Sequence, residues 1–567
     1  MSLAMPLSGM TDAVKQHAGR IRGRICENVD EQDFVPNDAI SELASPEYVR
    51  HILKANPQYL PQGVSVKDLV DYVVDQNRPA KKVFLILVYC DLLRYLGCLR
   101  VVGFCDRHLP IETSWDGQRE WYNVRTGHGQ HKTWPSFNTW LAGQVESFKS
   151  KQWVFMAPVF ATDTFDYIIP RKCPLPIQKR TDHSKRGYSG SVFEVRIHEA
   201  HLQIKLKGTC KRIASKEMHI NMQEYYMKEA ESLRIIRDLD HNHLIQPLAA
   251  YTKGELQGFL FPWAEGGNLK EFWGSERRLA AADPRLMRWV LYQLCGLCEA
   301  TRELHKKNCR HTDLKPENIL LFREGGQPGT LRIADVGLAR IHDDETRQRQ
   351  AITKAKTGSV RYEPPELGRV KQLSRVFDVW CLGCVFLEFL IWTVYGWSKL
   401  NDFSRETTRF WEHSADGQLQ QDQQVKRLIT DMFSDLNSGN TGSQSALKDC
   451  LALVTGRMLV PDPNERAEVA SVHSELERIC DLGNREERYL LNRSLTIPES
   501  TNVNSPGTVS LNTGKLEIPV TSVHAQEVSG TISNYSSAGA NQKSFSMLVI
   551  ISYRGNASEA DVIIRML

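Results

Sequence analysis

A polar run, His311-Thr312-Asp313-Leu314-Lys315-Pro316-Glu317-Asn318, is followed seventeen residues after its asparagine by Asp335. A site that transfers a phosphoryl group must mainly hold metal ions, position a hydroxyl and neutralise charge on the phosphate oxygens. Asp313 could accept the proton of an incoming hydroxyl, and Lys315 could reach the transferred phosphate with a point charge. Asn318 and Asp335 offer hard oxygen ligands for Mg²⁺. These residues indicate a phosphoryl-transfer site.

Together with Asp335-Val336-Gly337 and Pro364-Pro365-Glu366, this run resembles the H-R-D-x-K-x-x-N and D-F-G patterns of the eukaryotic protein kinase family, with Thr312 in place of Arg and Val336 in place of Phe. The resemblance covers roughly residues 180 to 480. It implies an α+β, bilobal fold with a small β-rich lobe and a large helical lobe, which binds ATP and Mg²⁺. Lys315 makes the pattern similar to serine/threonine kinases, whose substrates are protein Ser or Thr hydroxyls.

The family's nucleotide clamp resembles Gly187-Tyr188-Ser189-Gly190-Ser191-Val192, in which two glycines would let backbone N–H groups approach phosphates. Lys185 stands where the family's first glycine would be. A G-x-x-G alone is more typical of a hairpin turn, so this interpretation depends on the downstream motifs. Gly187, Gly190 and Val192 are thereby predicted to contact the nucleotide.

The family's β3 lysine, which grips the α and β phosphates, is assigned to Lys211, with Lys205 as the competitor. Glu229 is its expected partner, because Glu229 and Leu233 have the spacing of one helix face. Lys211 lies eighteen residues before Glu229 and Lys205 twenty-four, and the shorter connection is more similar to the family. Lys205 is expected to be a solvated strand residue.

The hinge between the lobes is expected within Phe259–Leu269, with Phe261 behind the adenine. Pro262 can offer its carbonyl and Ala264 its N–H to the adenine ring. The resemblance also places Leu320 in the nucleotide pocket. Thr209 would stand in place of the small alanine above the adenine and would add a polar oxygen to an apolar wall.

Other expectations concern regulation and support of the site. Thr312 cannot form the charge-assisted pair that an arginine makes with a phosphate on the activation segment, so activation by loop phosphorylation is not expected. Glu366 and Arg466 are expected to form a buried ion pair. Asp378 would tie its helix to the catalytic loop, and Val336 would leave a looser column with His311 and Leu233.

Composition limits the remaining classes. The 71 basic and 67 acidic residues give a net charge of +4, so neither nucleic acid nor an anionic membrane is implied as a partner. Cys295-x-x-Cys298 and Cys381-x-x-Cys384 lie in apolar helical segments and are interpreted as core thiols in a reducing compartment, not zinc ligands. The apolar run Val83 to Cys90 is too short to span a bilayer. We expect a soluble protein of the cytoplasm or nucleus.

Residues 1–175 are expected to form a separate, mainly helical domain that binds a regulatory protein. Apolar residues recur at helical spacing in Ala39–Leu53 and Leu69–Val74, and the later aromatic residues are interpreted as core: Trp115, Trp121, Trp134, Trp140, Trp153, Phe155 and Phe160. The arrangement resembles the regions that precede some fungal kinase domains. Arg171–Pro176 is predicted as the linker to a kinase domain at 180–480. Residues 482–567 are rich in Ser, Thr, Asn and Gly and are predicted to be mostly disordered, with one short strand at Met547–Tyr553.

Two functions follow from the sequence. The first is an active serine/threonine protein kinase that uses ATP and Mg²⁺. The second is a catalytically weak or inactive pseudokinase that acts as an ATP-binding signalling scaffold, which Lys185, Thr209, Thr312 and Val336 favour. Because every acidic and amide group needed for the chemistry is present, the sequence favours the enzyme.

Overall fold

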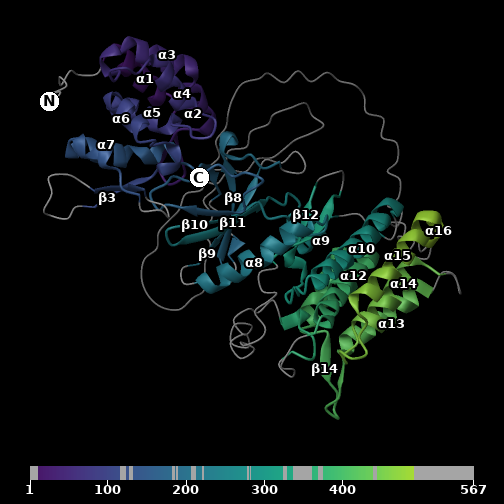
Figure 1. Ribbon diagram of the computed structural model, residues 1–567. Coiled ribbons are helices and arrows are strands. Elements are labelled where there is room, and N and C mark those ends of the chain that lie inside the picture. Colours follow the sequence, from purple (N-terminus) through teal and green to yellow (C-terminus); the bar gives the residue numbers. More distant parts are fainter. Residues whose placement is uncertain are drawn as a thin grey trace, which may run out of the picture. The chain divides into compact units, whose positions relative to one another are not determined.

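The computed structural model describes residues 11–114, 123–126, 132–181, 185–186, 190–205, 212–219, 222–276, 280, 283–323, 328–335, 360–367, 374–437 and 444–490. All of them belong to one compact unit, Met1–Ile497. Along the chain, a mainly helical N-terminal region is followed by a seven-stranded sheet and then by a second helical region (Figure 1). The tail expected to be disordered and its strand at Met547–Tyr553 lie outside the described residues.

The N-terminal region is built around α5 (Lys81–Tyr89), in which all six residues from Val83 to Val88 are buried. Such a helix is apolar on every side because other helices surround it. The helices that share its hydrophobic cluster are α1 (Asp12–Arg22), α2 (Asn37–Leu43), α3 (Pro46–Ala55), α4 (Val66–Val74), α6 (Leu96–Val101) and α7 (Ala142–Lys151). Two strand pairs accompany them, β1 (Cys26–Glu27) with β2 (Asp33–Phe34) and β3 (Ile111–Ser114) with β4 (Asn123–Thr126).

Sequence periodicity located α2, α3 and α4 but not every boundary. The periodic stretch Ala39–Leu53 forms two helices, because Ser45 caps the second one through the N–H of Tyr48 and Pro46 occupies its first turn. The core interpretation of the aromatic residues is confirmed for Trp134, Trp140, Phe155 and Phe160, which are buried. Trp153 packs against the core while half-buried, and Trp115 and Trp121 lie outside the described residues.

The central sheet has the strand order β5-β10-β11-β9-β8-β6, and β7 pairs with β8. Its strands are β5 (Asp166–Ile169), β6 (Ile177–Arg180), β7 (Lys185–Arg186), β8 (Gly190–Ile197), β9 (Ile213–Met218), β10 (Ala249–Lys253) and β11 (Leu256–Pro262). Side chains alternate between two clusters: Phe259 and Phe261 pack on the side of α8 (Gln223–Leu239), whereas Leu260 packs on the other face.

Two features of this sheet correct the predicted boundary near residue 175. Strand β5 precedes that boundary, yet it pairs in parallel with β10. The predicted linker is also packed, because Cys173 is 2% and Leu175 4% exposed among the residues under the sheet. Asn28 of the N-terminal region donates from its side chain to the Leu175 carbonyl at 2.9 Å. The segment 171–176 therefore joins two strands of one sheet and is not a flexible connection.

The helical lobe follows β11. Its elements are α9 (Leu269–Ser275), α10 (Pro284–Lys306), β12 (Ile319–Phe322), β13 (Thr330–Ile333), α12 (Val376–Glu406), β14 (Trp411–His413), β15 (Leu419–Gln421), α13 (Gln423–Asn437), α14 (Ala446–Leu453), α15 (Val469–Arg485) and α16 (Glu487–Leu490). Helix α12 bends at Gly396, which has φ of 77°. It is apolar and long enough to cross a membrane, but 94% of its most apolar stretch is buried, so it is a core helix.

The end of this lobe also differs from the prediction. Helices α15 and α16 continue past residue 482, and Tyr489 and Leu490 are buried in the same core. The packed chain therefore includes the first nine residues of the segment predicted as tail, 482–490. The cysteine interpretation is confirmed for Cys298, Cys381 and Cys384, which lie in α10 and α12, and burial raises the pKa of each thiol.

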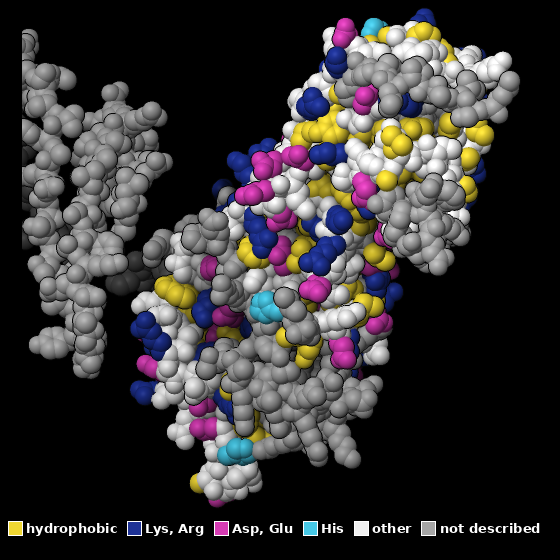
Figure 2. Space-filling model, turned by 90° about the vertical axis from the view of Figure 1, so that its left-hand side faces the viewer, with side chains coloured by type: hydrophobic (Ala, Val, Ile, Leu, Met, Phe, Trp, Pro, Cys, Tyr) yellow, Lys and Arg dark blue, Asp and Glu magenta, His cyan; other side chains and the backbone are white. Residues whose placement is uncertain are grey.

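Charged side chains are mixed on the face drawn in Figure 2, where Lys and Arg alternate with Asp and Glu and do not gather into one patch of either sign. The mixture agrees with the small net charge of +4.

Candidate active site

The predicted catalytic loop lies between α10 and β12, and Asp378 of α12 holds its backbone. The Asp378 carboxylate accepts hydrogen bonds from the N–H groups of His311 at 2.9 Å and Thr312 at 2.8 Å, and it lies 2.8 Å from His305 Nε2. Thr312 has φ of 63°, a conformation that costs free energy for a β-branched residue. Since Asp378 bonds both flanking N–H groups, it maintains this turn. The predicted tie between helix and loop is confirmed.

The electrostatics of Asp378 suit that role. Burial alone would raise the pKa of its carboxyl group, but hydrogen bonds from His305 and Thr312 and the nearby histidines more than offset burial and lower the pKa. A carboxylate that stays ionised can accept both backbone bonds at once.

Three predicted residues of the loop meet around one carboxylate. The Lys315 ammonium is 2.7 Å from Asp313 Oδ2, and the Asn318 amide nitrogen donates to the same oxygen at 3.0 Å and to the Asp313 carbonyl at 2.8 Å. Because the nitrogen of the Asn318 side chain faces Asp313, its Oδ1 is the atom available as a ligand. The loop thus presents a base, a cation and an amide oxygen within a few ångströms.

Asp335 follows β13 and lies beside Asn318. The N–H of its neighbour Ala334 donates to the Asn318 carbonyl at 2.8 Å, and Asp335 has φ of 62°. Its side chain is 38% exposed, so it can reach a bound group. A carboxylate and an amide oxygen on adjacent backbones fit Mg²⁺, which is usually held by one or two protein ligands together with substrate phosphates and water.

The predicted lysine is the main correction at this site. Lys216 in β9 is 2.6 Å from Glu229 Oε1 and 2.6 Å from Asp335 Oδ1, so it is the lysine that pairs with the predicted glutamate. Lys211 lies outside the described residues, before β9 begins, and Lys205 is exposed as expected. Glu229 was identified correctly, but its partner is thirteen residues away and not eighteen.

A local sequence signal for Lys216 was missed. Ile213-Ala214-Ser215-Lys216 resembles the V-A-I-K pattern of the family's third strand. Ile213 and Ser215 are buried while Lys216 lies on the other side of the strand with Ala214, as the alternation of a strand requires. The small residue of the pattern is then Ala214, so the objection based on Thr209, which lies outside the described residues, no longer applies.

Lys216 is charged in this environment. Burial by itself would lower the pKa of its ammonium group, but the carboxylates of Asp335 and Glu229 outweigh burial and raise the pKa well above its ordinary value. A permanent positive charge that joins the sheet, α8 and the end of β13 can serve as a phosphate ligand.

The glycine segment is described only in part. Gly187 lies outside the described residues, whereas Gly190 begins β8. A Cβ at Gly190 would lie 2.2 Å from the Glu217 carbonyl oxygen of β9, so close strand packing already requires glycine here. Val192 pairs with Lys216 in the register of β8 and β9.

The predicted hinge connects β11 to α9. Phe261 is buried at the end of β11, and Pro262 pairs with Ile213. Ala264 begins a turn in which its carbonyl accepts the N–H of Gly267 at 3.2 Å. Leu320 in β12 and Ala264 are both partly buried and pack against the same large hydrophobic cluster.

The large lobe contains the ion pair that the sequence predicted between Glu366 and Arg466. Arg466 makes two hydrogen bonds to Glu366, at 2.7 and 3.0 Å, with 0% of its side chain exposed. The predicted buried ion pair is confirmed. Val336, which is predicted to leave a looser column with His311 and Leu233, lies outside the described part of the chain.

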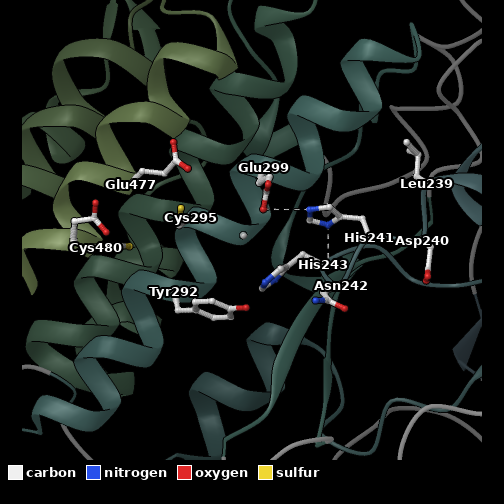
Figure 3. A pocket seen from close by; sticks show the side chains of 12 residues that line it. Leu239, Asp240, His241, Asn242, His243, Tyr292, Cys295, Glu299, Glu477 and Cys480 are labelled. Atoms are coloured by element: carbon white, nitrogen blue, oxygen red, sulfur yellow. Dashed lines mark hydrogen bonds and ion pairs between the residues drawn. The ribbon is translucent and has the colours of Figure 1, made fainter. Parts of the chain in front are cut away.

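A cavity of about 660 Å³ lies elsewhere, between the end of α8 and helices α10 and α15. His241 and Glu299 line it and point toward each other, with Cys295 and Cys480 on the helical side (Figure 3). His241 Nε2 lies 3.4 Å from Glu299 Oε2. Burial lowers the pKa of His243 to about 4, so this ring is neutral, and its Nδ1 lies 2.8 Å from the Leu331 carbonyl. The residues that line the cavity include none of the predicted site residues.

Comparison with known proteins agrees with this geometry. The family model of the protein kinase domain matches residues 186–476, just over half of the chain, so the chain belongs to the protein kinase family.

The similar curated proteins are kinases of low identity, and most of them are named serine/threonine-protein kinases. Serine/threonine-protein kinase PKH3 of Eremothecium gossypii is 28% identical over 39% of this chain and 29% of its own length. Aurora kinase C of Mus musculus is 27% identical over 36% of this chain and 67% of its length. Human serine/threonine-protein kinase 16 is 27% identical over 55% of this chain and 92% of its length. The fungal resemblance of the N-terminal region stays a prediction.

Proposed function

We propose that the chain is an active serine/threonine protein kinase that transfers the γ-phosphate of ATP to protein hydroxyls. The observation that carries the proposal is Lys216, which is 2.6 Å from both Glu229 and Asp335. Catalysis by a kinase requires two features: an ion pair between the sheet lysine and a helix glutamate, here Glu229 of α8, and an aspartate placed to bind the metal. The serine/threonine kinases among its relatives support the choice of acceptor.

Each residue has one task in this proposal. Lys216 holds the α and β phosphates, Pro262 and Ala264 bond the adenine, and Val192 and Leu320 enclose it. Asp313 orients the acceptor hydroxyl and takes its proton, while Lys315 neutralises charge on the moving phosphoryl group. Asn318 and Asp335 would hold Mg²⁺, which neutralises phosphate charge when bound.

The alternative is a pseudokinase that binds ATP as a scaffold. Lys185 in place of a glycine and Thr312 in place of an arginine favour it. The argument from Thr209 is gone, because Ala214 occupies the small position, and the ion pairs of Lys216 are those of an aligned site. We therefore retain the enzyme as the better proposal.

Regulation and location are part of the proposal. Thr312 offers no guanidinium to a phosphate, so we expect activity without phosphorylation of the activation segment. We place the protein in the cytoplasm or nucleus, in keeping with the free thiols of all its described cysteines. The N-terminal region would bind a regulatory protein.

The test is autophosphorylation with labelled ATP and Mg²⁺, comparing the intact chain with Asp313→Asn and Asp335→Asn. Asp313→Asn should lose about 10²- to 10⁴-fold in turnover and keep ATP binding, because only the base is removed. Asp335→Asn should also lose Mg²⁺-dependent ATP binding. Unchanged turnover in Asp313→Asn would refute the enzyme and leave the scaffold.

A further inference from the structure

The segment Thr162–Ile169 lies before the matched kinase domain, yet it attaches to the small lobe at its edge strand. Asp166 to Ile169 pair in parallel with Ala250 to Lys253 of β10, and the N–H of Ala250 donates to the Phe165 carbonyl at 2.8 Å. The pairing fixes the segment to the sheet, so the side chains next to it have a defined direction.

Phe165 points from this segment into the core beneath α8. It is 6% exposed and belongs to the cluster that contains Tyr226, Ala230 and Leu233, all on the buried face of α8. On the outer side, the guanidinium carbon of Arg237 lies 5.5 Å from the centroid of the Phe165 ring. The ring is thus held between the core and a cation of the same helix.

Two arginines of α8 grip the backbone and side chains of the segment. Arg234 makes two hydrogen bonds to the Asp166 carboxylate, at 3.0 Å from Nε and 2.7 Å from Nη2. Arg237 donates to the Thr162 carbonyl. Bidentate pairs of this kind fix orientation as well as distance. The helix is therefore attached to the segment through apolar, ionic and backbone contacts.

The same helix carries Glu229, which must reach Lys216 in the sheet. Glu229 lies one to two turns before Arg234 and Arg237, and it is 2.6 Å from the Lys216 ammonium. A helix moves as a rigid rod over so short a length, because each turn is hydrogen-bonded to the next. Contacts that fix the C-terminal half of α8 to the sheet thereby fix the position of Glu229.

We propose that Thr162–Ile169 is a clamp that holds α8 where Glu229 meets Lys216, so that residues outside the kinase domain position a catalytic ion pair. Phe165, Asp166 and Arg234 are positioning residues, because none of them contacts Lys216. The effect on turnover rests on the proposed kinase activity, whereas the position of α8 does not. A truncated protein that begins at Ile177 would lose the clamp and have an unaligned site.

The variants are made in the full chain. Phe165→Ala removes the buried ring and Phe165→Leu retains an apolar side chain. Asp166→Arg breaks the ionic contact, and adding Arg234→Asp restores it in the opposite direction. Ile168→Ala is the matched control, because Ile168 is in the same strand and its side chain is 83% exposed.

Hydrogen exchange of the α8 amides and steady-state kinetics are measured on each variant. Phe165→Ala and Asp166→Arg should each speed exchange in α8 and lower kcat by about tenfold, with a smaller change in the KM for ATP, because alignment and not binding is lost. Phe165→Leu and the charge swap should recover most of both effects. Ile168→Ala should match the unaltered protein.

Several results would overturn the clamp. If both Phe165→Ala and Asp166→Arg leave α8 exchange unchanged in a folded protein, the segment does not hold the helix. If the charge swap fails to slow exchange relative to Asp166→Arg, the ionic contact has no positioning role. If the unaltered chain shows no phosphotransfer, the proposed function fails, and the exchange data still decide whether the clamp exists.

Discussion

The catalytic loop and the small-lobe sheet differ in the sequence distance over which their functional contacts form. Asp313 and Asn318 bond each other across five residues, whereas Lys216 reaches Glu229 across 13 and Asp335 across 119. In the first region one short pattern contains the three side chains that meet at Asp313, namely Asp313, Lys315 and Asn318. In the second region, strand register and helix packing decide which lysine faces the carboxylates. The sequence spacing to Glu229 can therefore indicate the wrong lysine.

The largest expected effect tests which lysine of the small lobe, Lys216 or Lys211, binds the phosphates. Lys216→Met should lower phosphotransfer by at least about a hundredfold, because it removes a preorganised charge from the phosphates in a site where such charges dominate. Lys211→Met should change turnover by less than about twofold, because Lys216 supplies the cation that pairs with Glu229 and Asp335. Both are measured with labelled ATP at saturating peptide.

Stability of the purified variants serves as the control. Lys216→Met leaves Glu229 and Asp335 without their cation, so its thermal unfolding is recorded beside the kinetics to separate chemistry from folding. A large loss in Lys211→Met with a small one in Lys216→Met would return the original assignment and contradict the ion pairs described here.

The second prediction concerns the large lobe, where sequence and structure agree. Arg466→Met removes the partner of the buried Glu366 carboxylate and should destabilise the protein by about 3–5 kcal/mol. Lys306→Ala is the matched control, since its side chain is 60% exposed and its pair with Glu303 should contribute less than about 1 kcal/mol. Urea unfolding measures both. Equal midpoints for the two variants would mean that the buried pair does not support the lobe.

The difference between these regions also explains what the sequence could predict. Asp313, Lys315, Asn318, Glu366 and Arg466 belong to patterns whose spacing leaves one interpretation. The addition of β5 to the sheet had no such pattern, because a four-residue strand at a parallel edge has no periodicity that distinguishes it from a loop. The sequence did not predict the burial of Cys173 and Leu175, because the prolines around them are typical of linkers. Prolines also occur in packed connections between strands, such as this one. Contacts between distant segments depend on tertiary packing, which a short sequence motif does not predict.

The smallest expected effect tests one such distant contact, between the N-terminal helices and the small lobe. His201 Nε2 accepts the N–H of Asn37, the first residue of α2, at 3.1 Å, and its Nδ1 lies 2.8 Å from the Pro158 carbonyl. One neutral tautomer satisfies both partners, since Nδ1 donates and Nε2 accepts. Burial lowers the pKa of His201 to about 4, because the protonated ring would lose its hydration, and the nearby His198 and Lys82 lower the pKa further.

The sign of the pH dependence follows from this depressed pKa. Between about pH 6.5 and 4 the unfolded chain binds a proton that the folded chain does not, so stability falls as pH falls through this range. For His201 alone the loss on going from pH 7 to 5.5 should be about 1 kcal/mol. His17 and His243, whose pKa values burial also lowers to about 4, add to the same slope.

His201→Leu should be less stable than the unaltered protein at pH 7, because the first N–H of α2 loses its acceptor. Its stability should also fall less steeply on acidification. Urea unfolding at pH 7 and 5.5 measures both quantities, and Ile168→Ala, which leaves every histidine in place, should keep the original slope. An identical slope in His201→Leu would show that this histidine titrates alike in the folded and the unfolded protein, and the contact between α2 and the small lobe would then be held by other residues.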